Sequence, residues 1–498
     1  MLFNSYHFLI FFPLVVLMFY IVPRKWRTIW LLAASYYFYM GWNPKYAAII
    51  LLCTVVTWLG GRWMSAVSEN GRAGRLYQKL ILLGCCAVTL GILCFFKYAR
   101  FIWDSVAALA GGLQITMGEM PLRIVLPVGI SFYTFQALSY VIDVYRNQVP
   151  VQKSFLKYAL FVSFFPQLVA GPIERSDHLL AQVEQIEEMS FQTRRIVNGL
   201  IYMQYGFFLK LVLADNLAVY VDHIFERYFF YGSVELFLAA VGFAFQIYCD
   251  FSSYSAIAIG AAMVMGFELM ENFHAPYFAS SIQEFWRRWH ISLSSWFRDY
   301  VYIPLGGSHC SKRKYYLNLF LTFLVSGLWH GANWTFILWG VIHGLYQIIG
   351  GMLRPLKARL YPCLGIKMDS VSYHMGKILS TFLLTTFAWI FFRADSVRTA
   401  FLYIYNLFTK WNFWVLTDGS LKNTGFYNGV EWMVVLSGLI VLMCVDFILH
   451  KRNIRIDAFL EAQGNFFRML VVGLLFLSTL IFGNYGGYEA NAFIYFQF

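Results

Sequence analysis

The feature that most constrains this chain is its succession of apolar runs, many of them close to the length that crosses a lipid bilayer. Hydrophobic residues make up 59% of the 498 residues and charged residues only 13%, whereas soluble domains carry about 25% charged residues. The runs lack the two-residue alternation of an outer-membrane β-barrel, which leaves helices as the way to pair the backbone in lipid. The sequence therefore predicts an all-α, polytopic integral membrane bundle.

The apolar runs predict about eleven to thirteen membrane segments in a single integral-membrane domain over 1–498. Some runs are too short to cross a full bilayer and are expected to be tilted, broken or re-entrant, with protein or a cavity covering their backbone. The runs at 80–96 and 101–112, like those at 234–248 and 254–269, are expected to be separate spans. Pro127 and Gly129 predict a kink within another run, at 124–142.

Positive charge predicts the topology. No Lys or Arg precedes the first run, at about 8–22, whereas Arg24, Lys25 and Arg27 follow it closely. The positive-inside rule then places the N-terminus outside and these residues in the cytoplasm. The first run lacks a basic segment before it and a small-residue cleavage site after it, so we interpret it as a retained span.

The net charge of +12 could indicate nucleic-acid binding in a soluble protein. Here Lys and Arg are expected to collect in cytoplasmic loops and hold the topology, so no nucleic-acid partner is predicted. The eight Cys lie mostly in apolar runs, with no CxxC pair, no spaced Cys/His set and no H-E-x-x-H. The sequence therefore predicts neither a disulfide framework nor a metal site.

The segment 281–300 holds much of the polar chemistry of the chain. Interpreted as one helix, it places aromatic and apolar residues on one face and basic or polar residues on the other. Such a helix lies at a membrane interface or plugs a cavity between spanning helices. The aromatic face comprises Trp286, Trp289, His290, Leu293, Trp296, Phe297 and Tyr300, and the polar face comprises Gln283, Glu284, Arg287, Arg288, Ser295 and Arg298.

The segment 326–344 is apolar enough to be buried at membrane depth, yet it carries His330, Asn333 and His343. Each histidine lies within a Gly-xxx-Gly frame, and paired small residues let helices approach closely. On one unbroken helix turning about 100° per residue, His330 and His343 would lie on nearly opposite faces. They are therefore not expected to act as a pair, whereas His290 and His330, from different segments, could converge.

The polar residues have structural and functional interpretations. His330 is either a histidine satisfied by a backbone carbonyl or a cavity-facing general base, for which its usual pKa of about 6.5 is suitable. His290 is either packing among aromatic rings or a group that polarises a carbonyl. Arg287, Arg288 and Arg298 are either interfacial anchors or phosphate contacts.

Asp250 interrupts an apolar run and is interpreted as structural, either a buried partner of an Arg or Lys or a helix cap with Ser252 and Ser253. A Ser252–His330–Asp250 triad is disfavoured because no G-x-S-x-G elbow is present. Zinc held by His290, His330 and His343 is disfavoured because the histidines do not follow a ligand motif.

Three ordered motifs resemble the membrane-bound O-acyltransferase (MBOAT) family. They are EFWRRWHISLS at 284–294, RDYVYIPLGG at 298–307 and GLWHGANWTFILWG at 327–340. Stretches at 125–136, 171–175 and 206–210 and the segment around Asp250 resemble the bacterial branch that supports alginate O-acetylation, in the same order. The chain resembles the D-alanyl transferases that act on teichoic acid less closely.

The resemblance implies a helical bundle around a funnel or tunnel, with the catalytic motifs within 281–344. The family's invariant histidine corresponds to His330 and its companion to His290. The implied reaction moves an acyl group, here expected to be acetyl, from a cytoplasmic thioester to a hydroxyl. The candidates for holding donor or acceptor are Trp286, Arg287, Arg288, Arg298, Asp299, Asn333 and Trp334.

The implied donor is acetyl-CoA or a carrier-bound phosphopantetheine thioester, with no tightly bound cofactor. The implied acceptor is an exported cell-surface polysaccharide, served directly or through periplasmic or extracellular export and acetylation proteins. The implied location is the bacterial cytoplasmic membrane, with the lipid bilayer as a further partner. The alternatives are D-alanyl transfer toward teichoic acid, a transporter or flippase that uses Asp250, His330 and Arg298, and a structural scaffold for a polysaccharide exporter.

Overall fold

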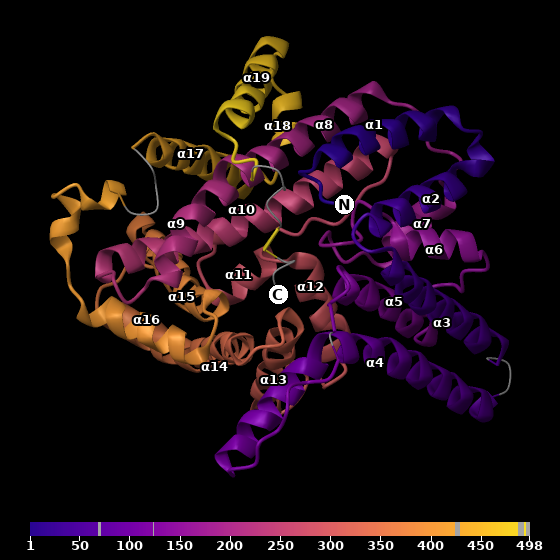
Figure 1. The fold of residues 1–498 in the computed structure, drawn as a ribbon, viewed down its shortest axis with the longest axis horizontal. Helices are drawn as coiled ribbons and strands as arrows, with labels where there is room; N and C mark the ends of the chain where they lie inside the picture. Colours follow the sequence, from indigo (N-terminus) through magenta and orange to yellow (C-terminus); the bar gives the residue numbers. More distant parts are fainter. Residues whose placement is uncertain (68–70, 123, 424–428, 487–492, 495–498) are drawn as a thin grey trace. The chain divides into compact units, whose positions relative to one another are not determined.

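The computed structural model describes residues 1–67, 71–122, 124–423, 429–486 and 493–494. Across these residues the regular structure is helical, apart from one isolated antiparallel β-bridge between Phe273 and Trp289 (Figure 1). Eight of the described helices are long and apolar enough to cross a membrane, and the shorter helix Tyr6–Ile21 is also apolar. The predicted all-α class is confirmed. The predicted count of eleven to thirteen membrane segments is higher than eight, because it also included shorter apolar runs.

The chain divides into two compact units. Two of the three chain boundaries between them fall inside continuous helices, α8 (Thr193–Phe208) and α10 (Ser233–Met265), and the third lies between Met270 and Glu271. The single domain expected over 1–498 stays a prediction. The first unit comprises Met1–Leu200 and Ile257–Met270, and the second comprises Ile201–Ala256 and Glu271–Phe498.

The first unit contains the longest helix, α4, which runs without interruption over 42 residues. The expected break between 80–96 and 101–112 is wrong, because the residues between those runs, Lys97 to Arg100, are good helix formers and include neither Pro nor Gly. The α-helices of this unit are α1 (Tyr6–Ile21), α2 (Arg27–Met40), α3 (Ala47–Ala66), α4 (Gly71–Gly112), α5 (Ile130–Tyr145), α6 (Phe155–Ser163), α7 (Ala181–Glu184), the start of α8 and the end of α10.

The expected kink at 124–142 is instead the start of a helix. Gly129 has φ 74°, in the left-handed region, and α5 begins at the next residue. A Cβ at Gly129 would lie 2.6 Å from the Leu168 carbonyl oxygen. Glycine is therefore required here both by the backbone angle and by the close approach of the neighbouring chain.

The second unit packs its helices around a core that includes the buried rings of Trp289, Trp339 and Trp389. The separate spans expected at 234–248 and 254–269 are wrong, because α10 passes through Asp250 unbroken. Besides parts of α8 and α10, this unit contains α9 (Asp215–Glu226), α11 (Ile282–Arg288), α12 (Ile291–Phe297), α13 (Lys312–His330), α14 (Trp334–Cys363), α15 (Val371–Arg393), α16 (Val397–Thr409), α17 (Gly429–Arg452), α18 (Ile456–Glu461) and α19 (Asn465–Phe482).

The segment 281–300 is not the single helix that its periodicity predicts. α11 ends at Arg288, and His290 has φ 45° and ψ 54°, which is left-handed, before α12 begins. The backbone on either side of this break pairs with 272–274: Ile291 N donates to Asn272 O at 3.0 Å, and His274 N donates to Arg288 O at 2.9 Å. These hydrogen bonds give partners to peptide groups that lose theirs where the helix ends.

The segment 326–344 is also two helices rather than one. α13 ends at His330 and the side chain of Asn333 caps the start of α14. His330 and His343 therefore do not lie on opposite faces of one helix. Gly327 and Gly340 face one another where α13 and α14 cross, since a Cβ on either would lie within 3.2 Å of the other glycine's Cα. The Gly-xxx-Gly frames thus allow the close approach that the sequence indicates.

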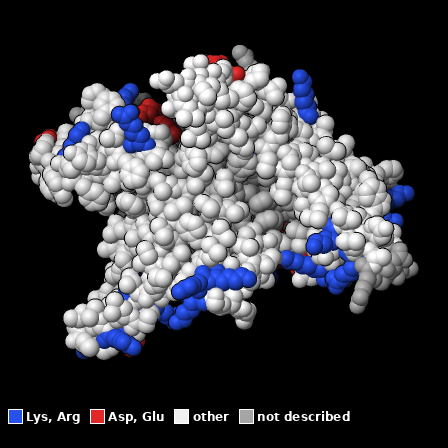
Figure 2. All heavy atoms as spheres, turned by 90° about the horizontal axis from the view of Figure 1, so that it is seen from below, with Lys and Arg blue, Asp and Glu red and all other residues white. Residues whose placement is uncertain are grey.

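The surface agrees with a protein that lies in lipid. On the face shown in Figure 2, uncharged residues form most of the surface, and Lys and Arg side chains gather in a few groups. Large apolar side chains of α17 and α19 are exposed, including Ile440 and Phe466. Lipid, which is as apolar as these side chains, can cover them without a penalty.

We expect Gly327→Ala to destabilise the protein by about 1–3 kcal/mol, because the new methyl group would overlap the Phe336 carbonyl oxygen and push α13 from α14. Thermal unfolding of the detergent-purified chain measures this. The matched control is Gly350→Ala, also in α14, where an added Cβ meets nothing within 4 Å. Equal unfolding temperatures for the two variants would contradict the close crossing.

Candidate active site

Two histidines from different segments lie side by side in the second unit. The ring centroids of His290 and His330 are 6.3 Å apart, with the ring planes at 63°. His290 is 0% exposed and His330 is 6% exposed. His290 comes from the break between α11 and α12, and His330 ends α13, so each imidazole stands at a helix end.

A buried polar network holds the His290 segment. Asn272 Oδ1 accepts hydrogen bonds from Ser292 Oγ at 2.6 Å and from Ser292 N at 3.3 Å. Asn272 Nδ2 donates to Ser255 Oγ of α10 at 3.1 Å. The side chain therefore ties the first turn of α12 to α10, which fixes where His290 lies. Sequence reasoning missed Asn272, because nothing near it forms a motif.

Aromatic rings surround His290. The Phe251 ring lies 4.6 Å away and the Trp329 ring 5.9 Å away, measured between centroids. Burial lowers the pKa of His290 to about 3, because a charged imidazole is poorly solvated in such surroundings. The ring is therefore neutral at physiological pH and can act through hydrogen bonding rather than through charge.

His330 belongs to an aromatic row that continues to His343. Trp339 lies between them, with its ring 4.9 Å from each imidazole. Trp286 Nε1 donates a hydrogen bond to His343 Nδ1 at 3.2 Å. His343 thus supports Trp286, a role that the sequence did not indicate. It is separated from His330 by the width of one indole ring.

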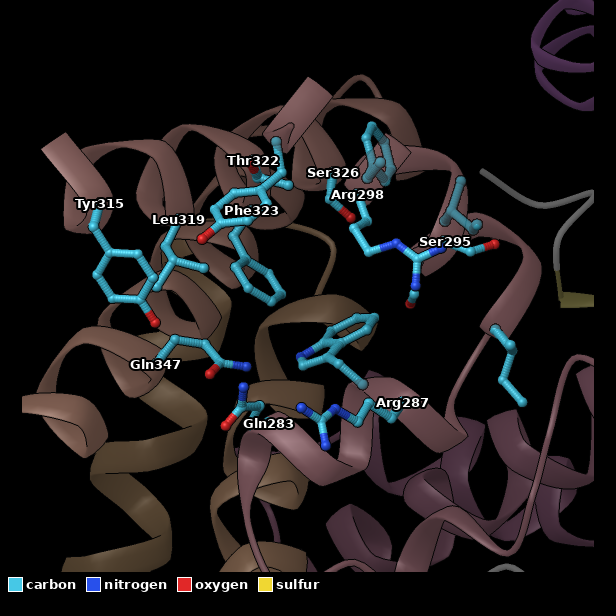
Figure 3. Close-up of a pocket in the computed structure, with 16 residues that line it drawn as sticks. Gln283, Arg287, Ser295, Arg298, Tyr315, Leu319, Thr322, Phe323, Ser326 and Gln347 are labelled. Atoms are coloured by element: carbon cyan, nitrogen blue, oxygen red, sulfur yellow. The ribbon is translucent and has the colours of Figure 1, made fainter. Parts of the chain in front are cut away.

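A pocket of about 400 Å³ lies beside the histidines (Figure 3). In Figure 3, Gln283 and Arg287 extend from α11 and face a row of α13 side chains, among them Tyr315 and Ser326. Two guanidinium groups, those of Arg287 and Arg298, line the pocket together with uncharged polar and apolar side chains. Guanidinium groups suit phosphate and carboxylate groups, because their donors match planar or tetrahedral oxygens.

The pocket reaches residues close to both histidines in the sequence. Its lining includes Ile291, which follows His290, and Ser326, which lies one helical turn before His330. The two histidines themselves are not among the lining residues of this pocket. The tunnel implied by the family resemblance stays a prediction.

The structure brings together some of the predicted binding residues and separates others. Trp286, Arg287 and Arg298 line the pocket, and Arg298 Nε donates to Asp299 Oδ1 at 2.7 Å. Arg288 points elsewhere and pairs with Glu284 at 2.6 Å.

Asn333 and Trp334 do not line this pocket either. Asn333 caps α14 and donates to the Asp395 carbonyl oxygen at 3.1 Å, and Trp334 is 56% exposed. Their roles in donor or acceptor binding stay predictions, as do the catalytic roles of the two histidines.

Asp250 has the basic partner that one of its two interpretations required. Lys210 Nζ lies 2.7 Å from Asp250 Oδ1 and 2.9 Å from Asp215 Oδ1, and all three side chains are at most 5% exposed. Asp250 Oδ2 also accepts from Ile494 N at 2.7 Å. Burying a carboxylate is costly unless a cation and hydrogen bonds compensate, and both are present. In the part of the chain that the structure describes, no group of three or more His, Cys, Asp or Glu side chains could hold a metal ion.

The long apolar helices define a class, that of polytopic membrane proteins. Residues 147–362 match the model of the MBOAT, membrane-bound O-acyltransferase family. The chain is 38% identical over 435 residues to a probable alginate O-acetylase of Pseudomonas aeruginosa, covering 86% of this chain and 79% of that protein. A peptidoglycan O-acetyltransferase of Helicobacter pylori is 34% identical, covering 75% of this chain and 72% of that protein. A teichoic acid D-alanyltransferase of Bacillus subtilis is 26% identical, covering 44% and 57%.

This chain belongs to the membrane-bound O-acyltransferase family, as its motifs predicted. It is accordingly a multi-pass membrane protein and an O-acyltransferase, which confirms the predicted class of enzyme. The matched region contains α11 to α13 and most of α14, and therefore both histidines and the pocket.

We expect Asn272→Ala to lower both stability and acyl-transfer rate, because it removes the buried partners of Ser292 and Ser255. The loss of stability should be about 1–3 kcal/mol, the usual result of leaving buried hydrogen-bonding groups unpaired. Thermal unfolding and a transfer assay on the same preparation measure the two effects. Asn465→Ala, at the exposed start of α19, is the control. A stable, fully active Asn272→Ala protein would show that this network does not position His290.

Proposed function

We propose that this protein moves an acetyl group from a cytoplasmic thioester to hydroxyl groups of an exported cell-surface polysaccharide, directly or through a partner protein. The single observation that carries the proposal is the meeting of two buried imidazoles beside a pocket that presents two guanidinium groups. The relatives add the acceptor class, because the alginate and peptidoglycan O-acetylating proteins cover more of the chain, at higher identity, than the D-alanyltransferase.

In this proposal His330 is the general base. Its imidazole takes the proton of the acceptor hydroxyl while the hydroxyl oxygen attacks the thioester carbonyl carbon. The tetrahedral intermediate then collapses, the carbon–sulfur bond breaks, and the thiolate leaves with the proton returned from His330. The products are an O-acetyl ester and a free thiol, so no oxidant or metal is consumed.

His290 has a different part in the proposed reaction. Because burial keeps its pKa at about 3, its neutral imidazole can donate a hydrogen bond to the carbonyl oxygen as negative charge develops there. A hydrogen-bond donor that is already in place before the reaction needs no reorganisation during it. His290 thus holds and polarises the thioester, and His330 moves the proton.

The pocket is the proposed site of the donor's phosphate groups. Acetyl-CoA and a carrier-bound phosphopantetheine both carry phosphate beside the pantetheine arm, and Arg287 and Arg298 provide charge-assisted hydrogen bonds. Neither donor is a tightly bound cofactor. Tyr315, which lines the pocket, directly follows the basic run Lys312 to Lys314 at the start of α13.

The same basic run supports a topology. Under the positive-inside rule it lies in the cytoplasm, so the pocket opens toward the side where thioesters are made. We place the protein in the bacterial cytoplasmic membrane, with its N-terminus outside. D-alanyl transfer toward teichoic acid is the second candidate, supported by the 26% identical relative. A translocation path through Asp250 is disfavoured, because Lys210 closes it into a buried ion pair.

We expect His330→Ala and His290→Ala each to lower acyl transfer by about 10²–10⁴-fold, the usual contribution of a positioned proton-transfer group. The assay measures transfer from labelled acetyl-CoA, or from an acetylated carrier protein, to polysaccharide. His374→Ala, which alters an exposed histidine at the start of α15, is the control. A His330→Ala protein that folds and acetylates at the wild-type rate would refute the assignment.

We expect the double variant Arg287→Gln/Arg298→Gln to raise KM for the donor by about tenfold to a hundredfold, the worth of one or two charge-assisted hydrogen bonds. The value of kcat should change little, because the histidines are left in place. Arg313→Gln, in the basic run outside the pocket lining, is the matched control. An unchanged KM would show that the pocket does not bind the acyl donor. Transfer of D-alanine in preference to acetyl would establish the second candidate.

A further inference from the structure

A second pocket, separate from the one beside His290 and His330, follows one face of α17. It has a volume of about 820 Å³ and is lined by the ring of Phe278 and by an apolar stripe of α17. The stripe recurs every three or four residues, so it forms one continuous face about 18 Å long. We call it the α17 groove. Its α17 residues are Leu436, Leu439, Ile440, Met443, Cys444, Phe447 and Ile448.

The α17 groove is open to its surroundings. Ile440 is 65% exposed and Phe447 is 50% exposed, and α17 is one of the helices able to cross a membrane. A length of about 18 Å is close to the thickness of one leaflet of the hydrocarbon core, about 15 Å. The groove therefore fits one acyl chain of a membrane lipid.

Basic side chains gather at one end of the groove. α17 ends in His450, Lys451 and Arg452, the last two of which are exposed. The Phe278 ring stacks on the His450 ring, with centroids 5.3 Å apart and planes at 15°. Arg288 Nη1 donates to His450 Nδ1 at 2.9 Å.

Cations outnumber carboxylates among the charged groups that act on His450 in the described residues, which are Arg288, Lys451 and Glu284. Glu284 supplies the carboxylate among them, and Arg288 Nη2 donates to it at 2.6 Å. Positive charge beside an apolar face matches a lipid whose headgroup is negative, since each Lys or Arg near a membrane surface strengthens the binding of anionic lipid about fivefold.

We propose that the α17 groove binds an anionic phospholipid, with one acyl chain against Phe278 and α17 and the phosphate on Lys451, Arg452 and His450. The charge cluster favours this occupant over a zwitterionic lipid, which brings no net charge. It also favours a lipid over a partner's transmembrane helix, which would need the apolar stripe but not the cations at its end.

The proposed lipid is linked to the segment that carries His290 through one side chain, that of Arg288. Arg288 binds His450, and the Arg288 carbonyl oxygen accepts from His274 N at 2.9 Å in the pairing that holds the helix break. A lipid that binds the folded protein stabilises it by mass action, and here it also stabilises the end of α11. The lipid site is independent of the proposed acyl transfer, because binding is measured without substrate.

The experiment compares lipids on the full-length, delipidated protein. Native mass spectrometry and thermal unfolding are recorded with phosphatidylglycerol and with phosphatidylcholine of identical acyl chains. We expect phosphatidylglycerol to be retained and to raise the unfolding temperature, and Lys451→Gln/Arg452→Gln to weaken its binding by about 30-fold. The matched control is Lys357→Gln/Arg359→Gln, which removes two exposed cations from the end of α14 and should bind as the wild type does.

A second variant tests the groove itself. Ile440→Trp fills the stripe without changing any charge, and it too should lower retention of phosphatidylglycerol. The proposal is overturned if both lipids bind equally, if the two charge variants behave alike, or if Ile440→Trp binds as the wild type does. A membrane protein bound at a fixed ratio and displaced by Ile440→Trp, with lipid retention unchanged, would also overturn it.

Discussion

Backbone hydrogen bonding is the constraint on which this structure depends. Peptide groups that leave a helix away from water must find partners within the protein. At the break before α12 those partners are the backbone groups of 272–274, and at the start of α14 the partner is the Asn333 side chain. With these partners at both breaks, His290 and His330 stand at helix ends with their rings 6.3 Å apart. Unbroken helices would have carried each imidazole along a packed face.

Local patterns in the sequence explain what could be predicted and what could not. The helical class, the glycine crossing of α13 and α14, and the family motifs depend on composition and on short-range spacing, which the sequence displays directly. The break at His290 depends on pairing with 272–274, residues whose importance appears only when the chain is folded. The pairing of Lys210 with Asp250 joins two segments 40 residues apart, so no short-range pattern indicates it.

Arg287 and Arg288, the last two residues of α11, face different surfaces of the protein. Helical periodicity assigns both to one polar face. In the structure Arg287 lines the pocket beside the histidines, whereas Arg288 turns to Glu284 and His450 at the end of α17. Adjacent residues on one helical turn diverge by about 100°, and α11 is short enough for that divergence to reach two different surfaces. The His290 segment thus lies between the proposed donor pocket and the proposed lipid groove.

The different surroundings of the two histidines suit the two parts of the proposed reaction. His290 is enclosed by rings, and its pKa of about 3 keeps it neutral throughout the physiological range. Two imidazoles this close could not both be positively charged without repulsion. With His290 held neutral, a proton taken from the acceptor hydroxyl has one place to go, the His330 ring, and it is released from there to the thiolate. An environment that fixes the charge of one member of a pair thereby assigns the proton transfer to the other.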